Sequence, residues 1–209
     1  ENEKQILIDN ISIDAYQPNE EIYAEGEVPT KVFSVLDGKV KILRRHGDYQ
    51  QIIRLLKKGE LFGYPAYFSN HEYATTAMVF KDSTVISIPI EVLDGFVRSN
   101  NTLCLNLLSY ACQRLRDSDE RCINMSHKHI RGRLAEAIIA LRDNYGYCKD
   151  GQTLAINFKR EDLANMSNMT TANAIRTLSA FAHEGVVSIE GKSIKILNEQ
   201  ELQIISKRG

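Results

Sequence analysis

Three residues in the C-terminal part of the chain, Thr171, Ala172 and Arg176, have side chains that can read the edges of DNA bases. A guanidinium can donate two hydrogen bonds to O6 and N7 of guanine, which is worth about 1–3 kcal/mol of discrimination. A threonine hydroxyl can bond to a base or a phosphate, and an alanine methyl can contact the methyl group of thymine. Because Ala172 and Arg176 are four residues apart, a helix places them on one face. The alternative is that Arg176 is an ordinary solvated surface charge.

The segment that contains these residues, 158–178, has the pattern of two short helices joined by a turn. Asn168 lies in the turn, where left-handed backbone is usually needed and asparagine tolerates it better than most residues. Thr170 can serve as the N-cap of the second helix. Apolar residues at helical spacing give each helix a face to bury: Leu163, Met166, Ala174, Leu178 and Phe181. This layout predicts a helix-turn-helix, whose second helix enters the major groove of DNA.

Other polar residues around the motif are candidates for phosphate contacts, which fix the register of a protein on DNA without reading sequence. Lys159 and Arg160 open the first helix, and Thr170 and Asn173 begin the second. Lys192 lies at the tip of a predicted hairpin that follows the motif. The two lysines can equally be ordinary exposed charges.

The charge of the chain is unevenly distributed. Residues 1–126 carry 14 Lys and Arg against 18 Asp and Glu, whereas residues 127–209 carry 12 against 9. The modest positive excess of the second part suits contact with phosphates, although ordinary surface scatter explains it as well.

The composition is that of an ordinary globular protein, with 43% apolar and 25% charged residues in a chain of 209. No apolar run approaches the roughly 20 residues that span a bilayer, and no signal peptide is visible. The four cysteines form no CxxC pair, so we expect neither a zinc site nor a disulfide framework. These features predict a cytoplasmic protein that does not associate with membranes.

The hydrophobic pattern divides the chain into three segments and predicts an α+β fold. Turn signals recur every 8–12 residues or so between short apolar runs in residues 11–90, which indicates a β-sandwich or jelly roll within a domain of residues 1–100. Residues 101–126 form a long helix, and 127–209 a second domain with a helix over 130–145, the helix-turn-helix and a hairpin wing that turns near Gly191.

The long helix has a narrow apolar stripe that is typical of a coiled-coil seam and hence of a dimer. Its members follow a spacing of three and four residues: Leu105, Leu108, Cys112, Leu115, Cys122 and Met125, with polar Asp119 among them. The alternative is that the stripe packs against the β-domain of its own chain.

Taken together, these segments resemble the CRP/FNR superfamily of bacterial transcription regulators. The resemblance depends on the order and spacing of four fragments: residues 22–26 (IYAEG), 36–41 (LDGKVK), 58–63 (KGELFG) and 132–135 (GRLA). It implies a jelly-roll-like β-roll sensor domain of the cyclic-nucleotide-binding type over 1–100, a dimerisation helix over 101–126 and a winged helix-turn-helix over 127–209. The implied partners are a second copy of the chain, a pseudo-palindromic site in double-stranded DNA, RNA polymerase and an unidentified small-molecule effector.

The recognition helix and the effector site both depart from the family pattern. The family often has an Arg-Glu pair and then an Arg four residues after the Glu, at positions that correspond here to Thr171, Ala172 and Arg176. Only the last arginine is kept, so we expect a half-site that retains one guanine contact and differs next to it.

In members that bind cyclic nucleotides, a Gly-Glu pair and an Arg about ten residues later hold the ribose and the phosphate. Here Gly63 is kept, whereas Tyr64 and Tyr73 stand at the Glu and Arg positions, so we do not expect cyclic AMP to bind. The two tyrosines either fill a pocket that has lost its ligand or line one for a flatter or less charged molecule. The candidate effector pocket comprises these residues and the positions that would face a purine: Gly63, Tyr64, Tyr73, Ala74, Ser118 and Asp119.

Other chemistries are poorly supported by the sequence. All cysteines lie at position 104 or later, which disfavours an iron–sulfur cluster, and the β-segment has only His46 and His71 as potential haem or cupin-type metal ligands. We therefore expect no cofactor, no metal and no enzymatic activity. The alternative function is a small-molecule-binding signalling module whose helix-turn-helix serves a protein–protein contact.

Overall fold

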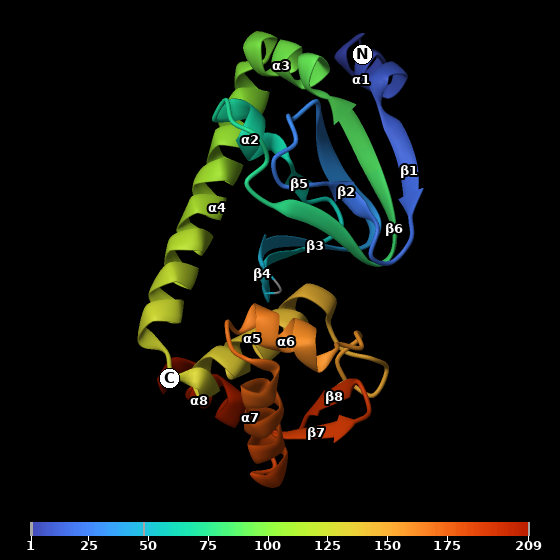
Figure 1. The fold of residues 1–209 in the computed structure, drawn as a ribbon. Helices are drawn as coiled ribbons and strands as arrows, with labels where there is room; N and C mark the ends of the chain where they lie inside the picture. The colour runs from blue at the N-terminus through green and yellow to red at the C-terminus, as the bar shows by residue number, and fades with distance from the viewer. Residues whose placement is uncertain (1, 48, 209) are drawn as a thin grey trace. The chain divides into compact units, whose positions relative to one another are not determined.

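The computed structural model describes residues 2–47 and 49–208, which form two compact units (Figure 1). The first unit comprises residues 1–48 and 53–116, and the second comprises 49–52 and 117–209. The elements of the first part of the chain are α1 (Asn2–Asn10), β1 (Ser12–Tyr16), β2 (Glu21–Tyr23), β3 (Lys31–His46), β4 (Tyr49–Leu56), β5 (Leu61–Phe62), α2 (Tyr64–Phe68), β6 (Thr76–Pro89) and α3 (Ile90–Ser99).

The first unit is built on an antiparallel sheet with the strand order β1-β6-β3-β4. The long strands β3 and β6 pair from Lys31 and Pro89 at one end to Leu43 and Thr76 at the other. Strands β1 and β2 also pair with β6, and β5 pairs with β3. Four consecutive residues are buried in each of the long strands, at 40–43 of β3 and 76–79 of β6. One apolar core includes Phe33, Val35, Val40, Phe62, Val79 and Val85.

Gly38 marks the place where β3 bends. The register of β3 against β6 shifts on both sides of this residue, and its φ of +92° is one that side chains rarely adopt. A Cβ on Gly38 would lie 2.3 Å from the carbonyl oxygen of Asp82 and 2.4 Å from Ser83 Oγ. That serine hydroxyl is buried and accepts a hydrogen bond from Lys39 N at 2.8 Å. The bulge is therefore closed by a contact that only glycine permits.

The helix α4 (Asn101–His127) is 27 residues long, as the apolar stripe predicts. None of its residues, all of which are described, is fully buried. The leucines of the stripe are among the most exposed apolar side chains: Leu105 is 65%, Leu108 58% and Leu115 63% exposed. The stripe is thus an apolar face that the single chain leaves uncovered.

The second unit is a small helical domain with a hairpin. It contains α5 (Ile130–Tyr145), α6 (Arg160–Met166), α7 (Thr171–His183), β7 (Val187–Glu190), β8 (Ser193–Ile196) and α8 (Glu199–Arg208). Helix α5 ends at Gly146, whose φ is +71°, and its buried face packs against α8. Fully buried large side chains from several helices and the hairpin form the core: Leu134, Ile138, Leu141, Phe158, Leu163, Leu178, Phe181, Ile194 and Leu202.

These observations confirm the predicted α+β architecture of an antiparallel N-terminal sheet, a long helix and a C-terminal helix-turn-helix with a wing. Helix α8, which closes the second unit, was not predicted, because its sequence is largely polar and only Leu202 and Ser206 are buried. No helix in the described part of the chain is both long and apolar enough to cross a membrane.

Candidate DNA interface and effector pocket

The two helices of the helix-turn-helix are held together by a short turn with a fixed geometry. Asn168 has a φ of +49°, as expected for the left-handed residue of the turn. Ser167 Oγ donates to the carbonyl of Leu163 at 2.8 Å, and Met169 N donates to that of Ala164 at 3.1 Å. Thr170 Oγ1 accepts a hydrogen bond from Asn173 N at 3.2 Å, so it caps α7 as predicted.

Helix α7 has one buried and one exposed face. Ala174, Leu178 and Phe181 are buried, whereas the predicted base-reading residues Thr171, Ala172 and Arg176 are all exposed. Arg176 Nη2 donates a hydrogen bond of 2.6 Å to Asn173 Oδ1, one turn earlier on the same helix. The guanidinium is therefore both outward-facing and oriented by a neighbouring amide, a role for Asn173 that the sequence did not reveal.

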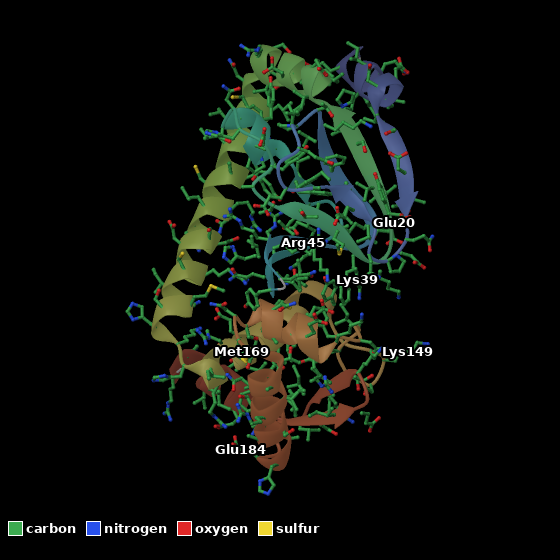
Figure 2. The ribbon with its side chains drawn as sticks, viewed as in Figure 1. Glu20, Lys39, Arg45, Lys149, Met169 and Glu184 are labelled. Atoms are coloured by element: carbon green, nitrogen blue, oxygen red, sulfur yellow. The ribbon has the colours of Figure 1, made fainter. Side chains whose placement is uncertain are left out.

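The predicted phosphate-contacting residues fall into two groups. Lys159 and Lys192 are exposed, at the start of α6 and in the hairpin turn. Arg160 is half-buried and donates from Nη2 to the carbonyl of Gly191 at 2.7 Å, and burial lowers the pKa of its guanidinium. Arg160 thus connects α6 to the tip of the wing. The side chains of the second unit are drawn in Figure 2, where Met169 marks the turn before α7.

The wing is joined to the segment before α6 by two further contacts. Ser193 Oγ donates to Asn157 Oδ1 at 2.9 Å, and Phe158 N approaches the carbonyl of Lys192 at 3.4 Å. Since Phe158 is itself buried in the core, the turn of the hairpin is fixed to the helix-turn-helix at several points.

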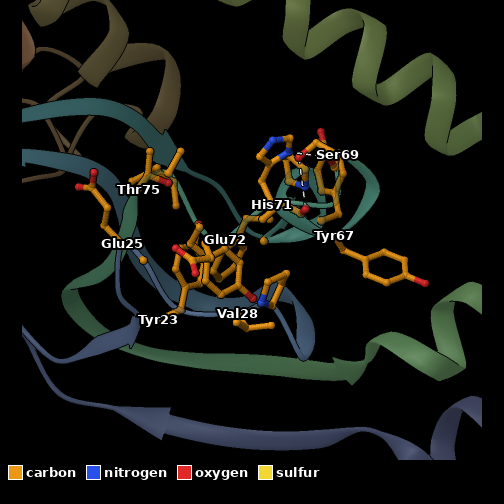
Figure 3. A pocket seen from close by; sticks show the side chains of 18 of the residues that line it. Tyr23, Glu25, Val28, Tyr67, Ser69, His71, Glu72 and Thr75 are labelled. Carbon is orange, nitrogen blue, oxygen red and sulfur yellow. Dashed lines mark hydrogen bonds between the residues drawn. The ribbon is translucent and has the colours of Figure 1, made fainter.

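The first unit contains a cavity of about 1180 Å³ beside α2 (Figure 3). Gly63, Tyr64, Tyr73 and Ala74 line it, together with residues from the loop after β2. Ser118 and Asp119 belong to α4 in the second unit and are not among the described residues that line this cavity. Gly63 has a φ of +82°, and a Cβ there would lie 3.0 Å from the ring of Phe33.

Tyr73 is packed into the core of the sheet. Its ring stacks on Tyr23 with 3.9 Å between centroids, and its hydroxyl donates to the carbonyl of Lys31 at 3.0 Å. Burial, reinforced by Tyr23 and Glu27, raises the pKa of the Tyr73 phenol well above its usual value. The side chain at the family's arginine position is therefore a neutral structural group.

Tyr64 is buried on the other side of the cavity. Its ring lies 5.9 Å from that of Tyr110 and packs in a cluster with Val32, Ile90 and Leu93. Burial again raises the pKa of the phenol. Both phenols are thus buried, neutral groups in the walls of the cavity.

Arg54, on β4, also lines the cavity and was not singled out from the sequence. Its Nη2 lies 3.8 Å from Glu60 Oε1, and Arg114 Nη1 lies 3.3 Å from the same oxygen. Nothing in the residue pattern signals this, because β4 and the cassette (residues 63–74, which include the family's effector-binding positions) come together only when the sheet folds. Among the described residues, no group of three or more His, Cys, Asp or Glu side chains is placed to hold a metal, and the four cysteines are free.

Comparisons with known proteins agree with this architecture. Residues 13–100 match the cyclic nucleotide-binding domain, and residues 132–205 match the Crp-like helix-turn-helix domain. The chain is 23% identical over 184 residues to a CRP-like cAMP-activated global transcriptional regulator of Mycobacterium tuberculosis, covering 87% of this chain and 82% of that protein. It is 24% identical to the cyclic AMP receptor protein of Thermus thermophilus, covering 91% and 86% of the two chains.

Among solved structures, FixK2 from Bradyrhizobium japonicum superposes with a TM-score of 0.83 at 21% identity, covering 93% of this chain and 96% of that one. A CRP/FNR-family protein of Eubacterium rectale gives a TM-score of 0.82 at 16% identity, covering 99% and 94% of the two chains. The two domain matches, in the same order along one chain and on this fold, show that the protein belongs to the CRP/FNR superfamily of DNA-binding transcription regulators.

Proposed function

We propose that the protein regulates transcription as a homodimer that places α7 of each subunit in the major groove of a pseudo-palindromic DNA site. The observation that carries this proposal is the exposed face of α7, on which Arg176 is oriented by Asn173 while the opposite face is buried in the domain core. In this proposal Arg176, Thr171 and Ala172 contact bases. The phosphate contacts come from Lys159, Arg160, Thr170 and Lys192, whereas Asn173, which the sequence also suggested for this role, orients Arg176.

The half-site should differ from that of typical members. Arg176 retains the donors that recognise O6 and N7 of guanine. Ala172 has no acceptor for a cytosine amino group, and its methyl group suits thymine instead. We therefore expect one guanine to be specified in each half-site and the neighbouring position to be read by apolar contact or by the Thr171 hydroxyl.

The test is a selection of binding sites from a randomised duplex, followed by measurements with Arg176→Ala. We expect a pseudo-palindrome with half-sites one helical turn apart and one conserved guanine in each. Arg176→Ala should weaken binding to the selected site by about 1–3 kcal/mol for each half-site and leave binding to random duplex almost unchanged. Selection of the usual family half-site, or equal losses on both duplexes, would contradict the proposed contacts.

The uncovered apolar stripe of α4 supports the dimeric part of the proposal, because regulators of this family act as dimers and a helix seam of this spacing joins two chains. RNA polymerase is the further protein partner that transcription regulation implies. We place the protein in the cytoplasm, where its DNA lies, and assign it no catalytic role.

The effector of this protein should not be cyclic AMP. The relatives from Mycobacterium and Thermus are described as cAMP-activated or as a cyclic AMP receptor. In this chain the positions that pair with the cyclic phosphate and the ribose carry Tyr73 and Tyr64, both buried and neutral. Calorimetric titration with cyclic AMP checks this, and saturable binding in the micromolar range would contradict it.

A protein–protein role for the helix-turn-helix remains the second function class, and salt dependence separates the two. A DNA-binding protein releases counterions, so the logarithm of its affinity for generic duplex falls linearly with the logarithm of salt concentration. A slope near zero would favour the second class.

A further inference from the structure

The cavity of the first unit has walls that suit an aromatic molecule. Aromatic side chains contribute from several elements: Tyr23, Phe62, Tyr64, Tyr67 and Tyr73. Val28, Pro29 and Ile42 add apolar surface. Flat rings gain stacking and edge contacts in such surroundings beyond the area that they bury.

Arg54 is the one guanidinium or ammonium group among the described residues that line this cavity. Its hydrogen bonds all leave from Nη2 and are long: 3.3 Å to the Tyr110 hydroxyl and 3.4 Å to the carbonyl of Leu61. Its Nε is buried and has no hydrogen-bond partner in the described structure. The side chain is 27% exposed. A guanidinium has five N–H donors, so most of the hydrogen-bonding capacity of Arg54 is unused.

The salt bridge of Arg54 is long and shared. Glu60 Oε1 lies 3.8 Å from Arg54 Nη2 and closer, at 3.3 Å, to Arg114 Nη1. A carboxylate matches the planar fork of a guanidinium, so an acidic group on a ligand would suit Arg54.

The remaining charged groups of the cavity limit the ligand to one acidic group. Glu25 and Glu72 also line it, and Figure 3 shows both among the drawn side chains. Glu25 is paired with Arg44 at 3.2 Å, and Glu72 is exposed. The His71 ring donates from Nδ1 to the carbonyl of Ser69 at 2.6 Å, which commits that nitrogen. A second acid on the ligand would meet these carboxylates.

We propose that the cavity binds an aromatic monocarboxylic acid whose carboxylate pairs with Arg54, in place of the cyclic nucleotide bound by other members. The proposal rests on the proposed function, that of a transcription regulator whose effector is not cyclic AMP. It relocates the anchoring charge from the cassette to strand β4, where the sheet brings it to the same cavity.

The experiment titrates the full-length protein with matched pairs of acid and neutral amide: benzoate with benzamide, and indole-3-acetate with indole-3-acetamide. Phthalate serves as the diacid. Calorimetry should show saturable binding of at least one monoacid, and at least tenfold weaker binding of its amide and of phthalate, since hydrogen bonds to charged groups are the strong ones. Arg54→Gln should weaken the binding of that monoacid by at least tenfold. Arg54→Lys keeps the positive charge but loses the planar guanidinium, so its affinity for the monoacid should lie between those of the wild type and Arg54→Gln.

Arg45→Gln is the matched control, because Arg45 pairs with Glu21 on the surface and neither residue lines the cavity. It should bind the monoacid as the wild type does. If Arg54→Gln fails to fold, the acid and amide pairs on the wild-type protein still decide the question.

Three outcomes would overturn the proposal: no monoacid binds below about 10 mM, amides bind as well as acids, or Arg54→Gln leaves affinity unchanged in a folded protein. Binding to the selected duplex is measured on the same samples with and without the acid. If the protein binds the duplex but none of the acids, this inference alone is wrong. If it binds neither the duplex nor the acids, the proposed function is wrong as well.

Discussion

Arg176 is oriented before any DNA is present. Its Nη2 donates a hydrogen bond of 2.6 Å to Asn173 Oδ1, and the residue lies on the exposed face of the helix. Holding a long side chain in one arrangement reduces the entropy that it loses on binding. Specificity at the guanine position thus depends on two residues, of which only one contacts the base.

The first prediction follows from this arrangement. Asn173→Ala should reduce the ratio of specific to non-specific affinity by about three- to tenfold, because Arg176 loses the acceptor that orients it. The salt dependence of binding to generic duplex should stay the same. If Asn173 instead contacted a phosphate, as the sequence suggested, Asn173→Ala would weaken binding to the specific and the generic duplex about equally and leave their ratio unchanged.

Ser179→Ala provides the control for that measurement, since Ser179 is an exposed polar residue later on α7. It should change neither the ratio nor the slope. An Asn173→Ala protein that loses affinity equally for specific and generic duplex would return Asn173 to the phosphate contacts.

From the sequence, the exposed and buried faces of the helices could be predicted, whereas the hydrogen-bond and salt-bridge partners of individual side chains could not. The exposed position of Arg176 and the cap at Thr170 followed from helical spacing and from the known preference for threonine at N-caps. The bond between Arg160 and Gly191 joins residues 31 positions apart, and the shared carboxylate of Glu60 joins β4 to α4. Such contacts depend on the tertiary fold, so no local pattern announces them.

At the scale of the elements, two hydrogen bonds hold the wing against α6 and the segment that precedes it. Arg160 bonds to the carbonyl at its turn, and Ser193 bonds to Asn157 in the segment before α6. A hairpin of two four-residue strands is marginal without such support. The position of Lys192 at its tip therefore depends on Arg160.

The second prediction tests that dependence. Arg160→Gln should lower the free energy of unfolding by about 1 kcal/mol and speed amide exchange at residues 191–193, because the wing loses a hydrogen bond from a charged donor. Lys159→Gln removes the same charge one residue earlier without touching the wing. It should leave amide exchange unchanged and lower only the salt slope. Equal exchange rates in the two variants would show that Arg160 does not support the hairpin.

The third prediction concerns the bulge in β3. Gly38→Ala should destabilise the protein by about 2 kcal/mol or more, since its Cβ would overlap the backbone at Asp82 and its φ of +92° is strained for alanine. Gly59→Ala is the matched control, with a φ of +83° and no atom within 4 Å of its Cβ. It carries only the conformational cost of roughly 1–2 kcal/mol. Urea unfolding compares the two, and similar losses would mean that the strand relaxes around Gly38.

Elements were predicted where their periodicity was strong. The long helix, the helix over 130–145 and the hairpin near Gly191 all appear at the expected residues. The antiparallel strands followed from turn signals, but their pairing did not, because β1 joins β6 from the opposite end of the segment. Helix α8 was missed, since its polar sequence buries only Leu202 and Ser206.

At the scale of the whole molecule, the apolar stripe of α4 is the feature that the single chain leaves unexplained. Leucines at positions 105, 108 and 115 are more than half exposed in the single chain. Burial of a leucine in a partner surface is worth about 1.5–3 kcal/mol, so a seam of such residues on two helices can hold a dimer. Dimerisation also doubles the reading surface, because two copies of α7 then bind one site together.

The fourth prediction follows from this coupling between assembly and DNA binding. Leu108→Glu should convert the protein to a monomer at micromolar concentration, because two carboxylates would oppose each other in the seam. Its affinity for the full palindrome should fall by about 10²- to 10⁴-fold, while affinity for a single half-site changes little. Leu36→Glu introduces the same charge at an exposed leucine of β3 and should alter neither property. Sedimentation velocity measures the oligomeric state, and titration of full-site and half-site duplexes measures the affinities. A Leu108→Glu protein that stays dimeric would place the dimer seam elsewhere. A monomer that binds the palindrome as tightly as wild type would show that dimerisation does not contribute to DNA binding.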